Sequence, residues 1–108
     1  MTDKYALILI TCASRREAEK ISNELLNKKL IACASILGSI DSKFWWKRKI
    51  ASAGEQLLLL KTLYKNFRRI ERIVKSIHSY DVPEIIAVPI RKGSRDYLRW
   101  IDMSCKNN

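Results

Sequence analysis

The side chains best suited to chemistry in this sequence lie between positions 78 and 84. The segment His78-Ser-Tyr-Asp-Val-Pro-Glu84 places an imidazole, a phenol and two carboxylates within seven residues. It falls where a helical pattern ends and a strand pattern begins, and loops at such junctions often carry functional residues. His78 could bind a metal ion, or it could stabilise the end of the preceding helix as a partial cation. It is the one histidine of the chain, so a metal would need other ligand types beside it.

A second pair of charged residues brackets an apolar run. Glu55 and Lys61 stand at the ends of Glu55-Gln-Leu-Leu-Leu-Leu-Lys61. Charged side chains at strand ends are usually solvated or paired. Alternatively, Lys61 and Glu84 lie at a subunit boundary, where an ammonium and a carboxylate orient an anionic ligand or each other.

Three aromatic residues follow one another at Phe44, Trp45 and Trp46. In a strand, Phe44 and Trp46 share one face while Trp45 takes the other, so both faces need a neighbour. Large aromatic side chains serve as interface anchors more often than as ligand platforms. This cluster therefore predicts packing within an oligomer.

The sequence argues against most catalytic and metal-cluster chemistries. It has no G-x-S-x-G or Walker glycine motif, and a single histidine excludes most catalytic triads. The three cysteines, Cys12, Cys33 and Cys105, form no C-x-x-C pair, which disfavours a zinc knuckle or a disulfide framework. Cys33, between two alanines, reads as a small buried apolar residue. We predict a protein that is not an enzyme, in a reducing compartment.

The chain is strongly basic, with a formal net charge of +10. Such a field attracts phosphates, anionic membrane surfaces or acidic proteins. The cluster Lys47-Arg48-Lys49 and a basic helix face suggest nucleic acid, but RNA-recognition sheets carry aromatic residues where this chain has Leu57 to Leu60. Nucleic-acid binding is therefore disfavoured, and a solvated basic face or an acidic partner remains.

Hydrophobic periodicity predicts the elements that position these residues. Ser14 and Glu17 form a capping box that begins the first helix. Bends are expected at Gly38 and at Asp41-Ser42, and Gly54 is expected to interrupt the extended arm. The predicted strands are Tyr5–Thr11, Ile31–Leu37, an arm over Lys43–Ile50, Glu55–Lys61 and Pro83–Ile90; the helices run from Ser14 to about Lys29, from Leu63 to Ile77, and after Gly93-Ser94.

The resulting order, β-α-β-β-α-β plus a final helix, predicts an α+β ferredoxin-like domain spanning residues 1–108. Two helices cover one sheet face, and the other face is left open and apolar. Open apolar faces usually mark interfaces, and the arm from Ile31 to Ile50 can reach past its own sheet to a second copy. The apolar run Tyr5–Ile10 is too short to span a membrane and has no signal-cleavage site, so we expect a cytoplasmic protein without a membrane partner.

Four features, in this order, resemble the CutA divalent-cation-tolerance family. They are Phe44-Trp-Trp46, Lys61-Thr62, the stretch from His78 to Ile85, and Tyr97-Leu-Arg-Trp100. The resemblance covers about Tyr5 to Ile101. It implies a tight homotrimer with a layout like the PII signalling proteins, clefts between subunits, and a link to tolerance of divalent cations, copper especially, with no established reaction.

Carried onto this chain, the resemblance implies a set of site residues at the subunit clefts. The implied ligand-cleft residues are Cys33, Glu55, Lys61, Tyr80 and Glu84, and the implied metal ligand is His78. The residues implied to pack in the trimer are Phe44, Trp45, Trp46 and Trp100. The implied ligand is copper, another divalent cation or a small molecule, none of them obligatory. The alternative is a structural or adaptor trimer that binds an acidic partner through its basic surface.

The chain departs from the family pattern near the implied metal site. Ile10 and Ile77 stand where some members have a cysteine and a second histidine, and Ser79 replaces a common proline. Cys12 follows two positions after Ile10, which keeps it on the same strand face. Arg48 replaces a common glycine, and a phenylalanine precedes the two tryptophans where tyrosine is common.

Overall fold

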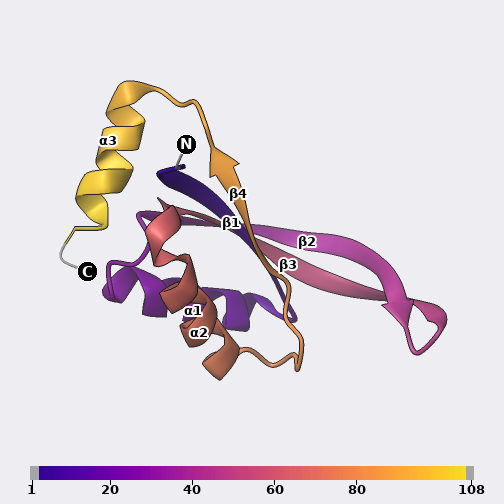
Figure 1. The fold of residues 1–108 in the computed structure, drawn as a ribbon. Helices are drawn as coiled ribbons and strands as arrows, with labels where there is room; N and C mark the ends of the chain where they lie inside the picture. Colours follow the sequence, from indigo (N-terminus) through magenta and orange to yellow (C-terminus); the bar gives the residue numbers. More distant parts are fainter. Residues whose placement is uncertain (1–2, 107–108) are drawn as a thin grey trace.

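A computed structural model describes residues 3–106 of the chain (Figure 1). It confirms the predicted order and the α+β class. Four antiparallel strands form one sheet in the order β2-β3-β1-β4, so β2 and β4 are its edges. The elements are β1 (Tyr5–Cys12), α1 (Arg15–Asn27), β2 (Cys33–Trp46), β3 (Lys49–Leu63), a 3-10 turn (Tyr64–Asn66), α2 (Phe67–Ile77), β4 (Ile85–Ile90) and α3 (Arg95–Ser104).

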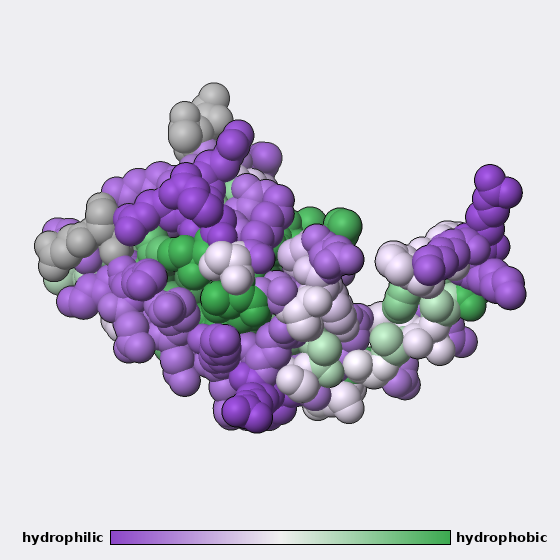
Figure 2. Space-filling model, turned by 90° about the horizontal axis from the view of Figure 1, so that it is seen from below, coloured by the Kyte–Doolittle hydropathy of each residue, from purple (hydrophilic) through white to green (hydrophobic). Residues whose placement is uncertain are grey.

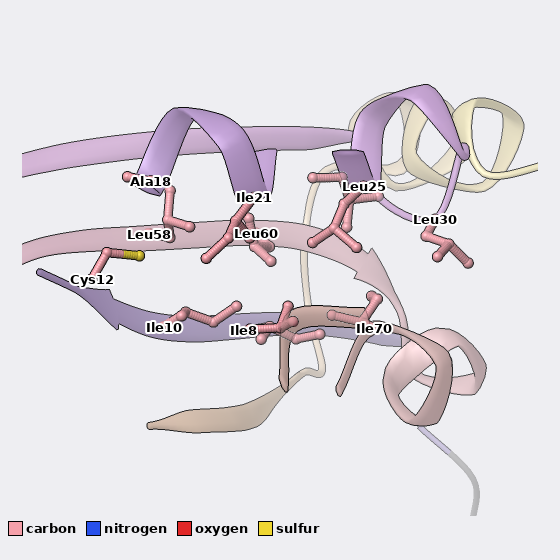
Figure 3. Packing of buried hydrophobic residues seen from close by; sticks show 12 residues of the cluster. Ile8, Ile10, Cys12, Ala18, Ile21, Leu25, Leu30, Leu58, Leu60 and Ile70 are labelled. Carbon is pink, nitrogen blue, oxygen red and sulfur yellow. The ribbon is translucent and has the colours of Figure 1, made fainter. Parts of the chain in front are cut away.

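Helices α1 and α2 lie side by side on one face of the sheet, where the core forms (Figures 1 and 3). Alternate residues of β1 and β3 point toward the helices, as the period of two in a strand requires. Burying each large aliphatic side chain contributes roughly 1.5–3 kcal/mol. The fully buried contributors include Ile8, Ile10 and Cys12 of β1, Leu58 and Leu60 of β3, Ala18, Ile21 and Leu25 of α1, and Ile70 and Val74 of α2.

The central hairpin is longer and more regular than the sequence predicts. The expected interruption at Gly54 is wrong, because Gly54 pairs with Asp41 inside a continuous β2–β3 ladder. A side chain at Gly54 would meet no atom within 4 Å, so this glycine serves no steric purpose. The pairing register shifts between Leu37 and Ile40, around Gly38. The bend expected at Asp41-Ser42 is wrong, because these residues pair in register with Gly54 and Ala53.

Two element boundaries also differ from the prediction. Leu63 ends β3 rather than starting a helix, because a 3-10 turn comes between it and α2. Pro83 lies before β4, which begins at Ile85 and runs along the sheet edge. Pro89 is tolerated within this edge strand, since one side of the strand needs no ladder partner.

The hairpin extends beyond the body as an arm and turns at Lys47-Arg48. The single extended segment expected over Lys43–Ile50 is therefore wrong, because this stretch contains the ends of two paired strands and the turn between them. Lys47 and Arg48 have φ of 49° and 65°, which matches the left-handed pair of a two-residue hairpin turn. Figure 2 shows the arm standing away from the body, with strongly hydrophilic groups at its tip and paler, less hydrophilic surface along it. Trp45 on this arm is 73% exposed.

The second sheet face is apolar and only partly covered. Leu7 and Leu9 of β1 and Leu57 and Leu59 of β3 are partly exposed there, as are residues of β4. Helix α3 packs at one end through a small cluster of Leu63, Ile101 and Cys105. No helix within residues 3–106 is long and apolar enough to cross a membrane.

Candidate functional site

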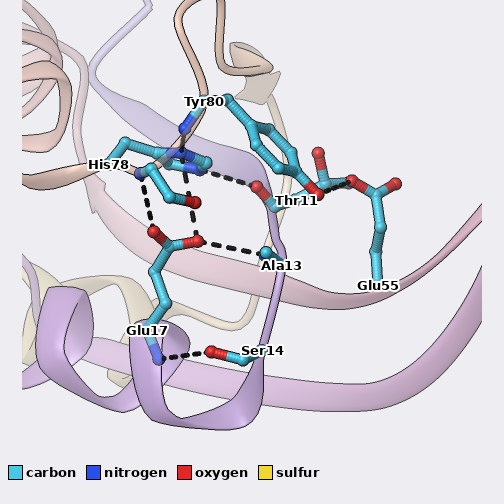
Figure 4. Close-up of polar contacts among 8 residues, drawn as sticks. Thr11, Ala13, Ser14, Glu17, Glu55, His78 and Tyr80 are labelled. Atoms are coloured by element: carbon cyan, nitrogen blue, oxygen red, sulfur yellow. Dashed lines mark hydrogen bonds and ion pairs between the residues drawn. The ribbon is translucent and has the colours of Figure 1, made fainter.

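Glu17 links the start of α1 to the loop that follows α2 (Figure 4). Ser14 caps the helix, accepting a hydrogen bond from the Glu17 N–H at 3.1 Å, as the capping box predicts. The returning Glu17 carboxylate accepts from the Ala13 N–H at 3.0 Å rather than from the cap residue itself. Its other oxygen accepts from the Ser79 N–H at 2.7 Å, so one carboxylate holds two segments together.

His78 is held by hydrogen bonds at both ring nitrogens. Its side chain is fully buried, and Nε2 lies 2.8 Å from the carbonyl oxygen of Thr11. A carbonyl oxygen only accepts, so Nε2 carries the hydrogen. Nδ1 is then the acceptor for the Tyr80 N–H at 3.0 Å. The neutral imidazole therefore links β1 to the loop that carries it. Its only nitrogen lone pair in the ring plane, at Nδ1, already accepts a hydrogen bond.

Tyr80 connects this loop to the central hairpin. Its ring packs against His78 with centroids 4.8 Å apart, and its hydroxyl donates to Glu55 Oε2 at 2.8 Å. Burial, reinforced by the hydrogen bond and the charge of Glu55, raises the pKa of Tyr80 to about 12. The phenol therefore remains a donor at neutral pH, and it satisfies a carboxylate that is only 7% exposed.

Two groups beside His78 have pKa values set by their surroundings. Burial, with smaller contributions from Glu17 and Glu55, raises the pKa of the Cys12 thiol to about 12. For Glu17, burial is the largest effect and opposes ionisation. The hydrogen bonds from Ala13 and Ser79 outweigh it and hold the pKa of Glu17 below its usual value.

These residues form one candidate metal site among residues 3–106. Potential ligand atoms of Cys12, Glu17 and His78 all lie within 4.8 Å of one another. Sulfur, carboxylate and imidazole donors suit zinc or copper, whose ligands sit at about 2.0–2.3 Å from the metal. The donor types of this cluster therefore fit either metal. In the present arrangement, however, the thiol is protonated and the Nδ1 lone pair accepts from Tyr80.

A separate polar cluster lies on the open sheet face. Lys61 pairs in register with Cys33 on β2 and with Leu7 on β1. Its Nζ donates to Ser35 Oγ at 2.8 Å and lies 3.8 Å from Cys33 Sγ. Cys33 is thus half-exposed beside a lysine, not sealed in the helix-side core.

Within one chain, the predicted cleft residues occupy three places. Tyr80 and Glu55 contact each other, and Cys33 and Lys61 contact each other. Glu84 is exposed just before β4, whereas the β4 residue level with Lys61 is Val88. A single chain therefore does not bring Lys61 and Glu84 together.

The aromatic residues predicted for packing are exposed in the single chain. Phe44, Trp45 and Trp46 lie on the arm, and Trp100 lies on α3 with its ring 5.4 Å from that of Tyr97. None of these four residues belongs to the buried core. They are available for an intermolecular contact.

The fold and this site define a class: a ferredoxin-like α+β domain with a sealed polar cluster at one sheet end and an uncovered apolar face. The profile described as "CutA1 divalent ion tolerance protein" matches residues 6–104. The chain belongs to this family.

Individual relatives agree with this assignment. The "Divalent-cation tolerance protein CutA" of Archaeoglobus fulgidus is 45% identical over 98 residues, covering 91% of this chain and 95% of the relative. "Protein CutA, chloroplastic" of Arabidopsis thaliana is 37% identical, and the match covers 94% of this chain but 56% of that longer protein.

Solved structures show the same fold. The structure described as periplasmic divalent cation tolerance protein CutA from Archaeoglobus fulgidus superposes with a TM-score of 0.92 at 42% identity, covering 94% of this chain and 99% of that one. CutA1 from Oryza sativa superposes with a TM-score of 0.94 at 32% identity, covering 99% and 98%.

Proposed function

We propose that this CutA protein is a non-enzymatic homotrimer that responds to metal ions by binding copper or another divalent cation at Cys12, Glu17 and His78. The observation that carries the metal site is the convergence of three donor types within 4.8 Å. The description of the family as a divalent ion tolerance protein is consistent with it. A bound cation would supply a cross-link between β1, α1 and the loop after α2.

Binding requires two changes in the chain itself. The Cys12 thiol must lose its proton, and His78 Nδ1 must release the Tyr80 N–H. Since metal ligands must be deprotonated, the affinity rises with pH. Glu17 is already ionised at neutral pH, because its pKa is below the usual value.

A competition titration with a chromophoric chelator tests the metal site, using Cu(I), Cu(II) and Zn(II) in turn. We expect one ion per chain for wild type, and a loss of at least tenfold in affinity for Cys12→Ala and for His78→Ala. Cys105→Ala removes a buried thiol at the other end of the domain and should bind like wild type. Equal, weak binding by all four proteins refutes the site.

The trimer is supported by two complementary surfaces on one chain. The arm carries exposed Trp45, Trp46 and Ile50, and the open sheet face carries exposed Ile86 and Val88. An arm that packs on the face of the next copy makes a heterologous contact, and such contacts produce rings when the rotation closes. Under this proposed packing, the predicted cleft residues lie at the boundaries between subunits.

Sedimentation velocity tests the assembly across protein concentration. We expect a species of three chains for wild type and a shift toward monomer for Trp45→Ser with Trp46→Ser. Leu26→Ser removes an exposed apolar side chain from the helix layer and should leave the assembly unchanged. A wild-type protein that sediments as a 12.6 kDa monomer would contradict the proposal.

An adaptor that binds an acidic partner is the second candidate. Helix α2 turns a row of exposed basic side chains outward, with Glu71 paired to Lys75 at 3.4 Å. The row comprises Lys65 of the preceding turn and Arg68, Arg69, Arg72 and Lys75 of α2. Binding to an acidic peptide that weakens steeply with salt supports this candidate, and RNA binding at low salt would contradict our view that nucleic acid is not a partner.

We also propose a cytoplasmic location, which rests on the sequence alone. Relatives are described as chloroplastic in Arabidopsis thaliana and periplasmic in Archaeoglobus fulgidus, so the compartment varies within the family. Cell fractionation tests it directly, and recovery of the protein outside the cytoplasm would overturn it.

A further inference from the structure

Lys61 is a charged residue within an apolar sheet face. Its neighbours on that face are Leu7 across the β1 ladder and, two positions away along β3, Leu59 and Leu63. Within residues 3–106, no carboxylate oxygen lies within 4.0 Å of its Nζ. The part of the chain that the structure describes therefore supplies no counter-charge in contact with this ammonium.

If another copy of the chain covers this face, Lys61 loses its contact with water. In the single chain the side chain is half-exposed and water can solvate the charge. Removing that water without supplying an anion leaves a buried charge uncompensated, which is strongly unfavourable. The carboxylate on the same strand cannot help, because Glu55 is six residues away, roughly 20 Å by strand rise, and accepts from Tyr80.

The groups around Lys61 are donors with spare hydrogens. An ammonium has three donors and no acceptor. One donates to Ser35 Oγ at 2.8 Å and a second, more weakly, to Cys33 Sγ at 3.8 Å, which leaves the third for an anion. Because Ser35 Oγ accepts this bond, its own O–H remains free to donate. The Cys33 thiol, 3.8 Å from Nζ and 3.9 Å from Ser35 Oγ, adds a weaker donor. This arrangement complements an oxyanion.

We propose that Lys61 and Ser35 form a binding site for an anion of the carboxylate or phosphate class at the boundary between subunits. The site rests on the proposed homo-oligomer. The anion is either a small free molecule or a carboxylate of a second copy, and the exposed Glu84, which forms no ion pair among residues 3–106, is the natural source of the latter.

Thermal unfolding and sedimentation of the full chain, with and without inorganic phosphate at constant ionic strength, test the site. For a free anion, phosphate at a hundred times its Kd multiplies the folded-to-unfolded ratio about a hundredfold, which raises Tm. Lys61→Met should lose this response and Lys61→Arg should retain part of it. Lys28→Met, which removes an exposed lysine paired with Glu24, should respond like wild type.

The second source gives a different pattern. If a carboxylate of a second copy fills the site, phosphate has no effect on wild type, and Lys61→Met and Glu84→Gln each weaken the oligomer. The double variant then weakens it no further than the single ones, because both changes remove the same interaction. Either pattern supports the anion site.

Two results overturn the inference, and they are distinguishable. A stable trimer that ignores phosphate and assembles as tightly with Lys61→Met as without it refutes the anion site alone. A wild-type monomer at every concentration refutes the proposed assembly, and it also refutes the anion site by removing the interface on which that site depends.

Discussion

Replacing Glu17 by glutamine should destabilise the protein more than any ordinary surface substitution. The Glu17 side chain is 11% exposed, and its two oxygens accept from the backbone N–H groups of Ala13 and Ser79. Glutamine keeps one acceptor oxygen but turns an NH₂ group toward the other N–H. One backbone donor then loses its partner and faces a second donor.

The size and the pH dependence of this effect follow from the same contacts. A hydrogen bond to a charged group contributes about 1.5–3 kcal/mol, so we expect Glu17→Gln to lower the free energy of unfolding by about 2–3 kcal/mol at pH 7. The pKa of Glu17 is lowered in the folded protein. Its charge therefore stabilises the fold above the unfolded pKa, and this contribution is lost as pH falls through the folded pKa.

Urea denaturation followed by circular dichroism, at fixed protomer concentration, measures the effect at pH 7 and again below pH 4. The difference between wild type and Glu17→Gln should shrink on acidification. Glu19→Gln is the matched control: Glu19 lies on the same helix, is mostly exposed and pairs with the exposed Arg15, so we expect a change below about 0.5 kcal/mol. Equal losses for the two variants, or a loss for Glu17→Gln that does not vary with pH, would refute the reasoning.

Three further predictions address the remaining contacts. Tyr80, whose pKa is raised to about 12, should give one phenolate transition near pH 12 in an ultraviolet titration, absent from Tyr80→Phe. The phenol's stabilisation is complete below the unfolded value near 10 and is lost as pH rises toward 12, and a Tyr80→Phe variant that instead loses a transition near pH 10 would contradict the burial. Arg48→Gly should raise the free energy of unfolding by about 1 kcal/mol, because a φ of 65° costs a residue with a side chain roughly that much. The control variant Lys43→Gly, within β2, should lower the free energy of unfolding. If both glycine variants are more stable than wild type, backbone strain at Arg48 is not the reason. Asn66→Ala should cost about 1–3 kcal/mol in chemical denaturation, because the buried amide donates to the Leu30 carbonyl at 3.0 Å; a cost near zero would show that this bond is replaced by water.

The fold could be predicted because the residues that each helix or strand buries follow a pattern visible in its own local sequence. The apolar run of β1, the capping box at Ser14 and the helical spacing after Phe67 are local signals, and all three correspond to elements of the structure. The predicted interruption at Gly54 was wrong because glycine permits backbone conformations that end a strand but does not require them. Ladder pairing with Asp41 determines its conformation, and that pairing involves a residue outside any local window.

The candidate site was only partly predictable. The sequence singled out His78 and Tyr80 because they are close together in one loop. Glu17 was recognised only as a helix cap, since its hydrogen bond to Ser79 spans 62 residues and leaves no local pattern. The distance between Lys61 and Glu84 likewise follows from strand register, because Lys61 lies level with Val88 rather than with Glu84.

Metal binding and subunit packing are linked through His78, under the proposed function. The Nδ1 lone pair can accept from the Tyr80 N–H or bind a cation, but it cannot do both. Tyr80 also holds Glu55, which lies in β3 where the arm leaves the body. A cation bound at Nδ1 must therefore disturb a contact at the root of the arm that reaches the next subunit. Because linkage is reciprocal, an assembly that fixes this arm must weaken cation binding by the same factor by which the cation loosens the assembly.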